Sequence, residues 1–219
     1  MARPTAKLER SRIYFVCEAG EDPATLDRLL EAALTGGVDL IQLRDKDADD
    51  ERLRASAPTF RAAADRHGAL FLINDRPDLV AACDADGVHL GQDDTPVAEA
   101  RRLAGPDAIV GLSTHFPDQL RAARDAGGDA RPDYLSVGPV WETPTKPGRP
   151  AAGMRYVELA AAEAELPWFA IGGIDAGNLA EVVAAGAERV VVVRAIRDAD
   201  DPEAVAAALR EGLRIGARR

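Results

Sequence analysis

The sequence predicts a single (β/α)8 barrel of the α/β class (a TIM barrel), and three observations carry that prediction. Eight short runs rich in valine, isoleucine and leucine are each followed by a longer segment of helical composition. The runs are apolar throughout, which is typical of parallel strands buried on both faces. The length of 219 residues suits one such barrel. A doubly wound open sheet is the alternative, but Cys17-Glu18-Ala19-Gly20 follows the first strand instead of the Gly-x-Gly-x-x-Gly of a dinucleotide fold.

The predicted strands are the apolar runs, taken in chain order. Branched aliphatic and aromatic residues prevail in them, and such residues favour extended backbone. The eight strands are Ile13–Cys17, Val38–Leu43, Ala69–Ile73, Gly87–Leu90, Ala108–Leu112, Tyr134–Val137, Trp168–Ile171 and Arg189–Val193.

The predicted helices occupy the alanine-rich segments between the strands, and start and stop signals bound them. Asp22 can cap a helix that has Pro23 as its first residue, and Gly36-Gly37 ends it. In the second helix we expect a break near Pro58. The helices are Pro23–Leu34, Asp49–His67, Pro77–Cys83, Pro96–Leu103, Pro117–Ala126, Arg155–Glu165, Ala176–Ala185 and Pro202–Ile215.

Composition excludes several classes of protein. The apolar fraction of 47% supports a sizeable core, while no stretch approaches the roughly 18 apolar residues of a membrane span. Residues 1–11 lack a signal-peptide pattern, so we expect a loosely ordered segment before a single domain at 12–216, and a cytoplasmic location. The net charge of −10 argues against nucleic acid, but not against a small anion held by local cations. Cys17 and Cys83 are expected to be buried, reduced thiols.

Polar side chains follow the second strand, at the end where barrels place their active sites. Gln42, Arg44 and Lys46 are alternate residues of an extended segment, so they point the same way. An amide, a guanidinium fork and an ammonium group together suit a diphosphate. The alternative is a strand end that frays into the charged turn Asp45-Lys46-Asp47.

Two carboxylates follow the third and fourth strands. Neighbouring strands lie about 4.8 Å apart, so Asp75 and Asp94 can share one cation. Mg²⁺ prefers one or two carboxylates together with water and substrate phosphates. The alternative is helix capping, because these residues lie just before Pro77 and Pro96. For Asp93 we favour a cap or a surface position.

Histidines and hydroxyls accompany the fourth and fifth strands. Ser113 can donate a hydrogen bond to a phosphate. His115 is either an acid–base group or a solvated side chain, and we favour the second interpretation. His89 lies inside an apolar run and is expected to be a core residue.

The remaining candidate site residues follow the last two strands or lie in the connection after the sixth strand. Gly172-Gly173 forms either a tight turn or a close approach to an anion, and Arg194 follows the eighth strand. The connection at 138–153 is too long for a simple turn. At its centre, Thr143-Pro144-Thr145-Lys146 offers two hydroxyls and a cation suited to phosphate oxygens.

These motifs resemble the thiamine phosphate synthases over almost the whole chain, from Ile13 to Ile196. Any one motif is weak, but six in order at strand ends are specific. They are Gln42-Leu43-Arg44-Asp45-Lys46, Asn74-Asp75-Arg76, Gly87 through Asp94, Ser113-Thr114-His115 with Val137-Gly138-Pro139, Thr143-Pro144-Thr145-Lys146, and Ala170-Ile171-Gly172-Gly173-Ile174.

The resemblance implies a transferase of thiamine biosynthesis. Such an enzyme joins 4-amino-5-hydroxymethyl-2-methylpyrimidine diphosphate to 4-methyl-5-(2-phosphoethyl)thiazole, giving thiamine phosphate and diphosphate. Carried over by motif, Asp75 and Asp94 would bind Mg²⁺. The pyrimidine diphosphate would be held by Gln42, Arg44, Lys46, Asn74, Ser113 and Lys146, with Arg44, Lys46, Ser113 and Lys146 as the catalytic set. The thiazole phosphate would be held by Thr143, Thr145, Gly172-Gly173 and Val193-Arg194.

One position departs from the family's pattern, and two other functions compete. Where the family usually has a small residue after the eighth strand, this chain has Arg194. A thiazole tautomerase would need the phosphate site and His115, but not the six groups of the diphosphate and metal site together. A sensor that binds a thiamine precursor would need no metal pair. A homodimer is the commonest oligomer, although the sequence shows no interface stripe.

Overall fold

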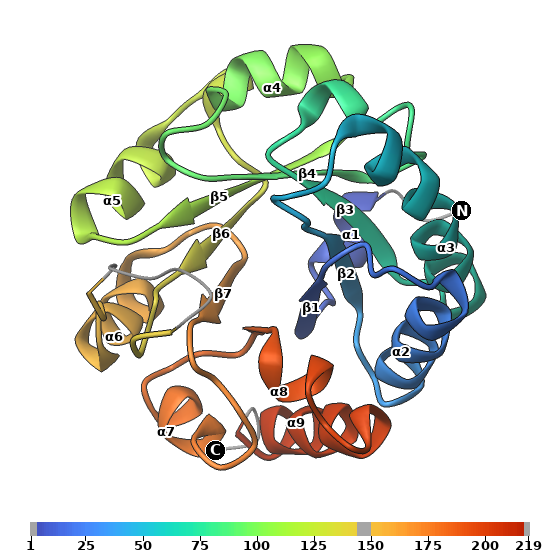
Figure 1. Ribbon diagram of the computed structural model, residues 1–219. Helices are drawn as coiled ribbons and strands as arrows, with labels where there is room; N and C mark the ends of the chain where they lie inside the picture. Colours follow the sequence, from blue (N-terminus) through green and yellow to red (C-terminus); the bar gives the residue numbers. More distant parts are fainter. Residues whose placement is uncertain (1–3, 144–149, 217–219) are drawn as a thin grey trace.

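The computed structural model describes residues 4–143 and 150–216, and it forms a closed barrel of eight parallel strands in sequence order (Figure 1). The strands are β1 (Ile13–Cys17), β2 (Leu40–Leu43), β3 (Leu70–Asn74), β4 (Gly87–Leu90), β5 (Ile109–Thr114), β6 (Tyr134–Val137), β7 (Trp168–Ile171) and β8 (Val190–Val192). Ile13 pairs with Val190, which closes the ring between β1 and β8. The predicted fold class is confirmed, and the open-sheet alternative is wrong.

Helices surround the ring of strands, except for α1, which lies at one end of it (Figure 1). They are α1 (Pro4–Leu8), α2 (Pro23–Thr35), α3 (Asp50–His67), α4 (Val97–Ala104), α5 (Pro117–Asp125), α6 (Met154–Glu163), α7 (Leu179–Ala184), α8 (Arg194–Arg197) and α9 (Pro202–Gly216), with 3-10 turns η1 (Pro77–Leu79) and η2 (Gly128–Ala130). Asp22 caps α2 by accepting hydrogen bonds from the backbone of Ala24 and Thr25. No described helix is both long enough and apolar enough to cross a membrane.

Four helical segments differ from the sequence-based expectation. Helix α3 runs unbroken through Pro58, because this proline lies on the exposed face, where water can solvate the carbonyl that it leaves unpaired. The segment after Pro77 forms only the 3-10 turn η1. Helix α7 begins late because Asp175 accepts hydrogen bonds from the backbone of Gly177 and Asn178, which holds that stretch as a loop. The short helix α8 was not predicted.

The amino-terminal segment also differs from expectation, because it contains α1. Leu8 of this helix is only 2% exposed and joins the apolar cluster inside the barrel. In Figure 1 the helix is seen through the ring of strands. The helix therefore contributes to the closed, amino-terminal end of the barrel.

Inward-facing side chains change character along the barrel axis. Near the amino ends of the strands they are apolar, with Leu40, Leu70 and Ile109 in one buried cluster. Two or four residues further along the same strands, the inward positions become Gln42, Asn74 and Ser113. The barrel therefore has an apolar base and a polar upper layer, at the end where βα loops build active sites.

Candidate active site at the carboxyl ends of the strands

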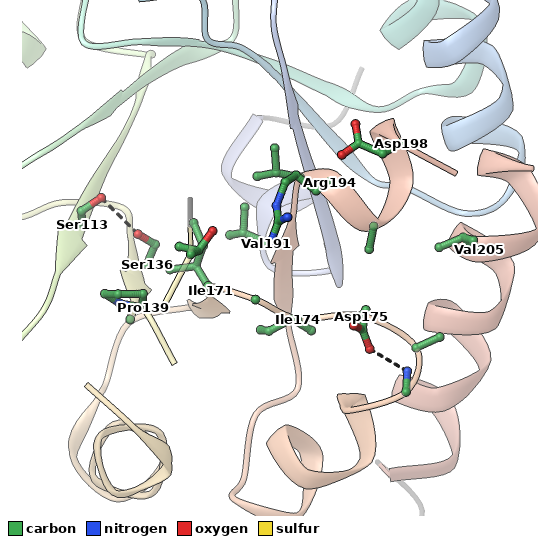
Figure 2. A pocket seen from close by; sticks show the side chains of 18 of the residues that line it. Ser113, Ser136, Pro139, Ile171, Ile174, Asp175, Val191, Arg194, Asp198 and Val205 are labelled. Carbon is green, nitrogen blue, oxygen red and sulfur yellow. Dashed lines mark hydrogen bonds between the residues drawn. The ribbon is translucent and has the colours of Figure 1, made fainter. Parts of the chain in front are cut away.

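Two cavities open over the carboxyl ends of the strands, and they adjoin. The larger, of about 540 Å³, lies over β5 to β8 (Figure 2). The smaller, of about 70 Å³, lies toward β1 to β4. Ser113, Ile171 and Val193 line both cavities, so they mark the junction. Two ligands bound side by side would meet there.

The smaller cavity collects the polar residues that follow β2 and β3. Gln42, Arg44 and Asn74 line it, together with Ser113 from β5. The backbone N–H of Arg44 donates to the carbonyl oxygen of Cys17 over 2.9 Å. The ladder between β1 and β2 thus extends past the end of β2, which argues against a frayed strand end at Arg44.

Asp75 and Asp94 lie against each other beside this cavity. Burial raises the pKa of Asp75 to about 6, and a shared hydrogen bond with Asp94 and the charge of Asp94 add to that effect. The charge of Lys46 and a hydrogen bond from Asn74 act in the opposite direction. The structure therefore brings the predicted metal pair together and places the predicted diphosphate residues Lys46 and Asn74 next to it.

The capping alternative does not describe these two aspartates. The 3-10 turn η1 has Arg76 as its N-cap and α4 has Pro96, and neither turn nor helix has a side-chain cap. Asp94 instead accepts from the backbone N–H of Gly91 over 2.7 Å, and Asp75 has a left-handed backbone with φ of 58°.

This donor set suits a hard divalent cation. Among the described residues there is no group of three or more His, Cys, Asp or Glu side chains able to hold a metal. Two facing carboxylates beside a cavity lined by Arg44 suit Mg²⁺, which takes one or two carboxylates when water and phosphate oxygens complete its shell. The charge of Asp94 helps to raise the pKa of Asp75, and a cation bound between the two carboxylates would relieve this repulsion.

The larger cavity has a glycine-rich wall. Gly172 and Gly173 line it with φ of 108° and 72°, in the left-handed region that favours glycine. A Cβ on Gly172 would lie 2.5 Å from Cβ of Pro139. The backbone of Val140 donates to the carbonyl oxygen of Ile171 over 2.8 Å. Gly172-Gly173 is therefore both a tight turn and a close approach of two loops, beside an open space.

The opposite wall comes from the end of β8. Val193 is the N-cap of α8, and Arg194 begins that helix, so the first-turn N–H groups of α8 lie at the cavity. Figure 2 shows Arg194 on this wall, and its side chain is exposed. Thr143 also lines the larger cavity. Thr145 and Lys146 fall within residues 144–149, outside the described part of the chain.

His115 corrects one expectation, because it is buried rather than solvated. Only 8% of the residue is exposed, and its Nδ1 lies 2.6 Å from the carbonyl oxygen of Gly138. Its backbone N–H donates to the side chain of Gln119, which anchors the loop that carries it. His115 lines the larger cavity.

Three hydroxyl groups were not predicted from the sequence, and one of them, Ser136, lines the larger cavity. Tyr14, Tyr134 and Ser136 lie inside apolar runs, where they read as core residues. In the structure they hydrogen-bond to Gln42, His89 and Ser113 respectively. The signal that could have found them is a polar tip at an inward-facing position of a strand that is otherwise apolar.

A family model described as thiamine monophosphate synthase matches residues 13–196. The chain belongs to the thiamine monophosphate synthase family. The thiamine-phosphate synthase of Thermus thermophilus is 58% identical over 191 residues, covering 87% of this chain and 89% of the relative. That of Thermobifida fusca is 50% identical over 208 residues, covering 94% of each.

Solved structures agree with membership of the thiamine monophosphate synthase family. The thiamine phosphate pyrophosphorylase of Pyrococcus furiosus superposes with a TM-score of 0.83 at 29% identity, over 97% of this chain and 98% of that one. A 3-hexulose-6-phosphate synthase superposes with a TM-score of 0.67 at 20% identity, over 92% and 99%. The second likeness shows the barrel fold alone.

Proposed function

We propose that this chain is the transferase that joins the pyrimidine diphosphate to the thiazole phosphate, releasing diphosphate and forming thiamine phosphate. Family membership supports the reaction, and one observation of the structure carries it to this chain. Two adjoining cavities have different walls: Gln42, Arg44 and Asn74 line the smaller one, and the Gly172-Gly173 turn and the start of α8 line the larger one. A condensation of two phosphorylated substrates needs two such half-sites with a common boundary.

The smaller cavity is proposed to hold the pyrimidine diphosphate. Diphosphate must leave a CH₂ group attached to an electron-rich aminopyrimidine, and the 4-amino group can stabilise the carbocation that remains. The protein then needs to neutralise the departing charge rather than to supply a nucleophile. Arg44 and Lys46 suit this role, with Lys146 as a third cation, and Gln42, Asn74 and Ser113 orient the ligand.

The larger cavity is proposed to hold the thiazole phosphate. Backbone N–H groups of Gly173 and of the Val193-Arg194 segment suit phosphate oxygens, because helix starts and glycine turns present unpaired donors. Thr143 and Thr145 add hydroxyl donors. The thiazole nitrogen would then face the junction at Ser113, Ile171 and Val193, in line with the departing diphosphate.

Mg²⁺ is the proposed cofactor, held by Asp75 and Asp94. When bound, it would neutralise charge on the leaving diphosphate. The two aspartates supply the carboxylates, and Gly91 orients Asp94 through its backbone N–H. Lys46 lies close enough to influence the pKa of Asp75, so metal and lysine would act on the same end of the ligand.

The remaining proposals concern location and assembly. The described cysteines, Cys17 and Cys83, are buried and free, which supports the proposed cytoplasmic location, because reduced thiols are typical of that compartment. A homodimer stays a prediction.

One assay tests the proposed function. The protein is incubated with both phosphorylated substrates and Mg²⁺, and diphosphate and thiamine phosphate are measured. We expect the two products in equal amounts, with activity lost on chelation and in the Asp75→Ala/Asp94→Ala variant. Asp93→Asn is the matched control, because Asp93 is an exposed neighbour outside the pair. No product at any Mg²⁺ concentration would reject the synthase, and activity that survives chelation would reject the metal assignment.

A further inference from the structure

The side chain of Arg76 links the loop after β3 to helix α3. Its Nη1 and Nη2 donate to the two carboxylate oxygens of Asp50, the first residue of α3, and the bond from Nη2 measures 2.9 Å. Its Nε and Nη2 donate to the two carboxylate oxygens of Asp78 in η1 over 3.0 and 2.7 Å. Arg76 therefore binds each carboxylate with two hydrogen bonds, an arrangement in which the planar guanidinium is both strong and directional.

The residue before Arg76 is Asp75, whose backbone is strained. Its φ of 58° lies in the left-handed region, which a residue other than glycine keeps only when the surrounding structure holds it there. On one side, the N–H of Asp75 donates to the carbonyl oxygen of His89 over 2.9 Å. On the other side, the bound side chain of Arg76 fixes the next residue, whose backbone is also restricted by Pro77. Asp75 is thus held between two anchors.

We propose that Arg76 is a positioning residue, which keeps the Asp75 carboxylate beside Asp94 in the arrangement that a divalent cation needs. Arg76 is not among the described residues that line the two cavities, so it acts through the backbone of the loop and not on the ligand. The inference rests on the proposed function for the metal pair, and it adds the residue that sets the geometry of that pair.

Charge alone predicts the opposite effect, so the sign of the result is decisive. Removing the positive charge of Arg76 leaves more negative charge near the pair, which favours binding of a cation. Removing the anchor instead lets Asp75 leave its strained conformation, which separates its carboxylate from that of Asp94 and weakens binding.

Thermal unfolding over a series of Mg²⁺ concentrations measures this binding without any turnover. The rise in Tm with Mg²⁺ concentration gives a dissociation constant. For Arg76→Ala we expect that constant to rise about tenfold, the lower end of the loss found when groups that orient metal ligands are removed. Arg76→Lys keeps the charge but not the planar fork, so its constant should rise as well. This second variant keeps the test available if Arg76→Ala fails to fold.

Arg66→Ala is the matched control. Arg66 lies at the opposite end of the 18-residue helix α3, where it donates to Glu31 over 3.0 Å and to Asp27 over 2.7 Å. It therefore binds two carboxylates of a neighbouring element in the same way, at a place remote from the metal pair. Its removal should leave the dissociation constant for Mg²⁺ at the wild-type value.

Kinetics separate this inference from the proposed function. In the synthase assay, Arg76→Ala should need about tenfold more Mg²⁺ for half of its maximal rate, with kcat at saturating Mg²⁺ close to that of the wild type. A wild type whose Tm does not respond to Mg²⁺ would overturn the proposal. So would an unchanged or lower dissociation constant in both Arg76 variants, or an equal rise in Arg66→Ala. If the wild type makes no thiamine phosphate but the Mg²⁺ affinities follow the expected order, the proposed function is rejected and the positioning role stands.

Discussion

Replacing Asp75 by asparagine should stabilise the metal-free protein at alkaline pH while removing its response to Mg²⁺. Asp75 and Asp94 face each other, and the pKa of Asp75 is raised to about 6 by burial and by Asp94. The folded protein therefore binds the Asp75 proton more tightly than the unfolded chain does. The stability that this group contributes is fully present below the unfolded pKa of about 4 and is lost as the pH rises through about 6.

The size of the effect follows from the shift. A difference of about two pKa units corresponds to an upper limit of about 3 kcal/mol of unfolding free energy. The pair is partly exposed to solvent, which screens the repulsion, so we expect about 1 kcal/mol. For a domain of this size that corresponds to a rise in Tm of about 3 °C. Asparagine keeps the shape of the side chain and can donate a hydrogen bond to Asp94.

Thermal unfolding at pH 4 and pH 8, with and without Mg²⁺, measures this effect. At pH 8 without metal, Asp75→Asn should melt above the wild type, and at pH 4 the difference should vanish. Mg²⁺ should raise the Tm of the wild type but not that of the variant. Asp93→Asn should behave as the wild type throughout. A variant that melts below the wild type at pH 8, or a gain of equal size at both pH values, would refute the account of the pair.

Three other substitutions probe the barrel, the long connection and the surface. Gly111→Ala should lower the free energy of unfolding by about 1 to 3 kcal/mol, because the added methyl group collides with the Tyr134 ring. Urea unfolding measures this loss. An unchanged midpoint would contradict the close packing of Gly111 against Tyr134. Lys146→Ala should lower kcat more than it raises KM in steady-state kinetics, and a pure rise in KM would exclude a role on the leaving group. Arg121→Ala removes an exposed ion pair with Glu163 and should leave the midpoint of the same urea assay nearly unchanged, so a clear loss of stability would contradict a surface role.

The sequence predicted the strands well because a parallel barrel needs apolar residues on both faces of each strand. Helix boundaries were less predictable where a single side chain decides them. Asp175 delays the start of α7 by binding backbone N–H groups ahead of it. In the same way, an exposed position lets Pro58 stay within a helix that composition suggested it would break.

Site residues were predictable where they follow strands and hidden where they lie inside them. Gln42, Arg44 and Asn74 come at strand ends, and they do line one cavity. Tyr14 and Tyr134 lie mid-strand, and their polar tips matter only because the closed barrel brings β1 and β6 across from each other. That contact forms only when the barrel closes, so the pattern of residues along the chain does not reveal it.

Binding of each substrate alone tests the central claim, that two half-sites hold two different phosphorylated ligands. Calorimetric titration of the pyrimidine diphosphate with Mg²⁺, and of the thiazole phosphate, is carried out on Arg44→Ala and on Gly172→Ala. We expect Arg44→Ala to weaken binding of the pyrimidine diphosphate only, and Gly172→Ala to weaken binding of the thiazole phosphate only. If each variant weakens both ligands equally, or if the effects are exchanged, the assignment of the two cavities is wrong.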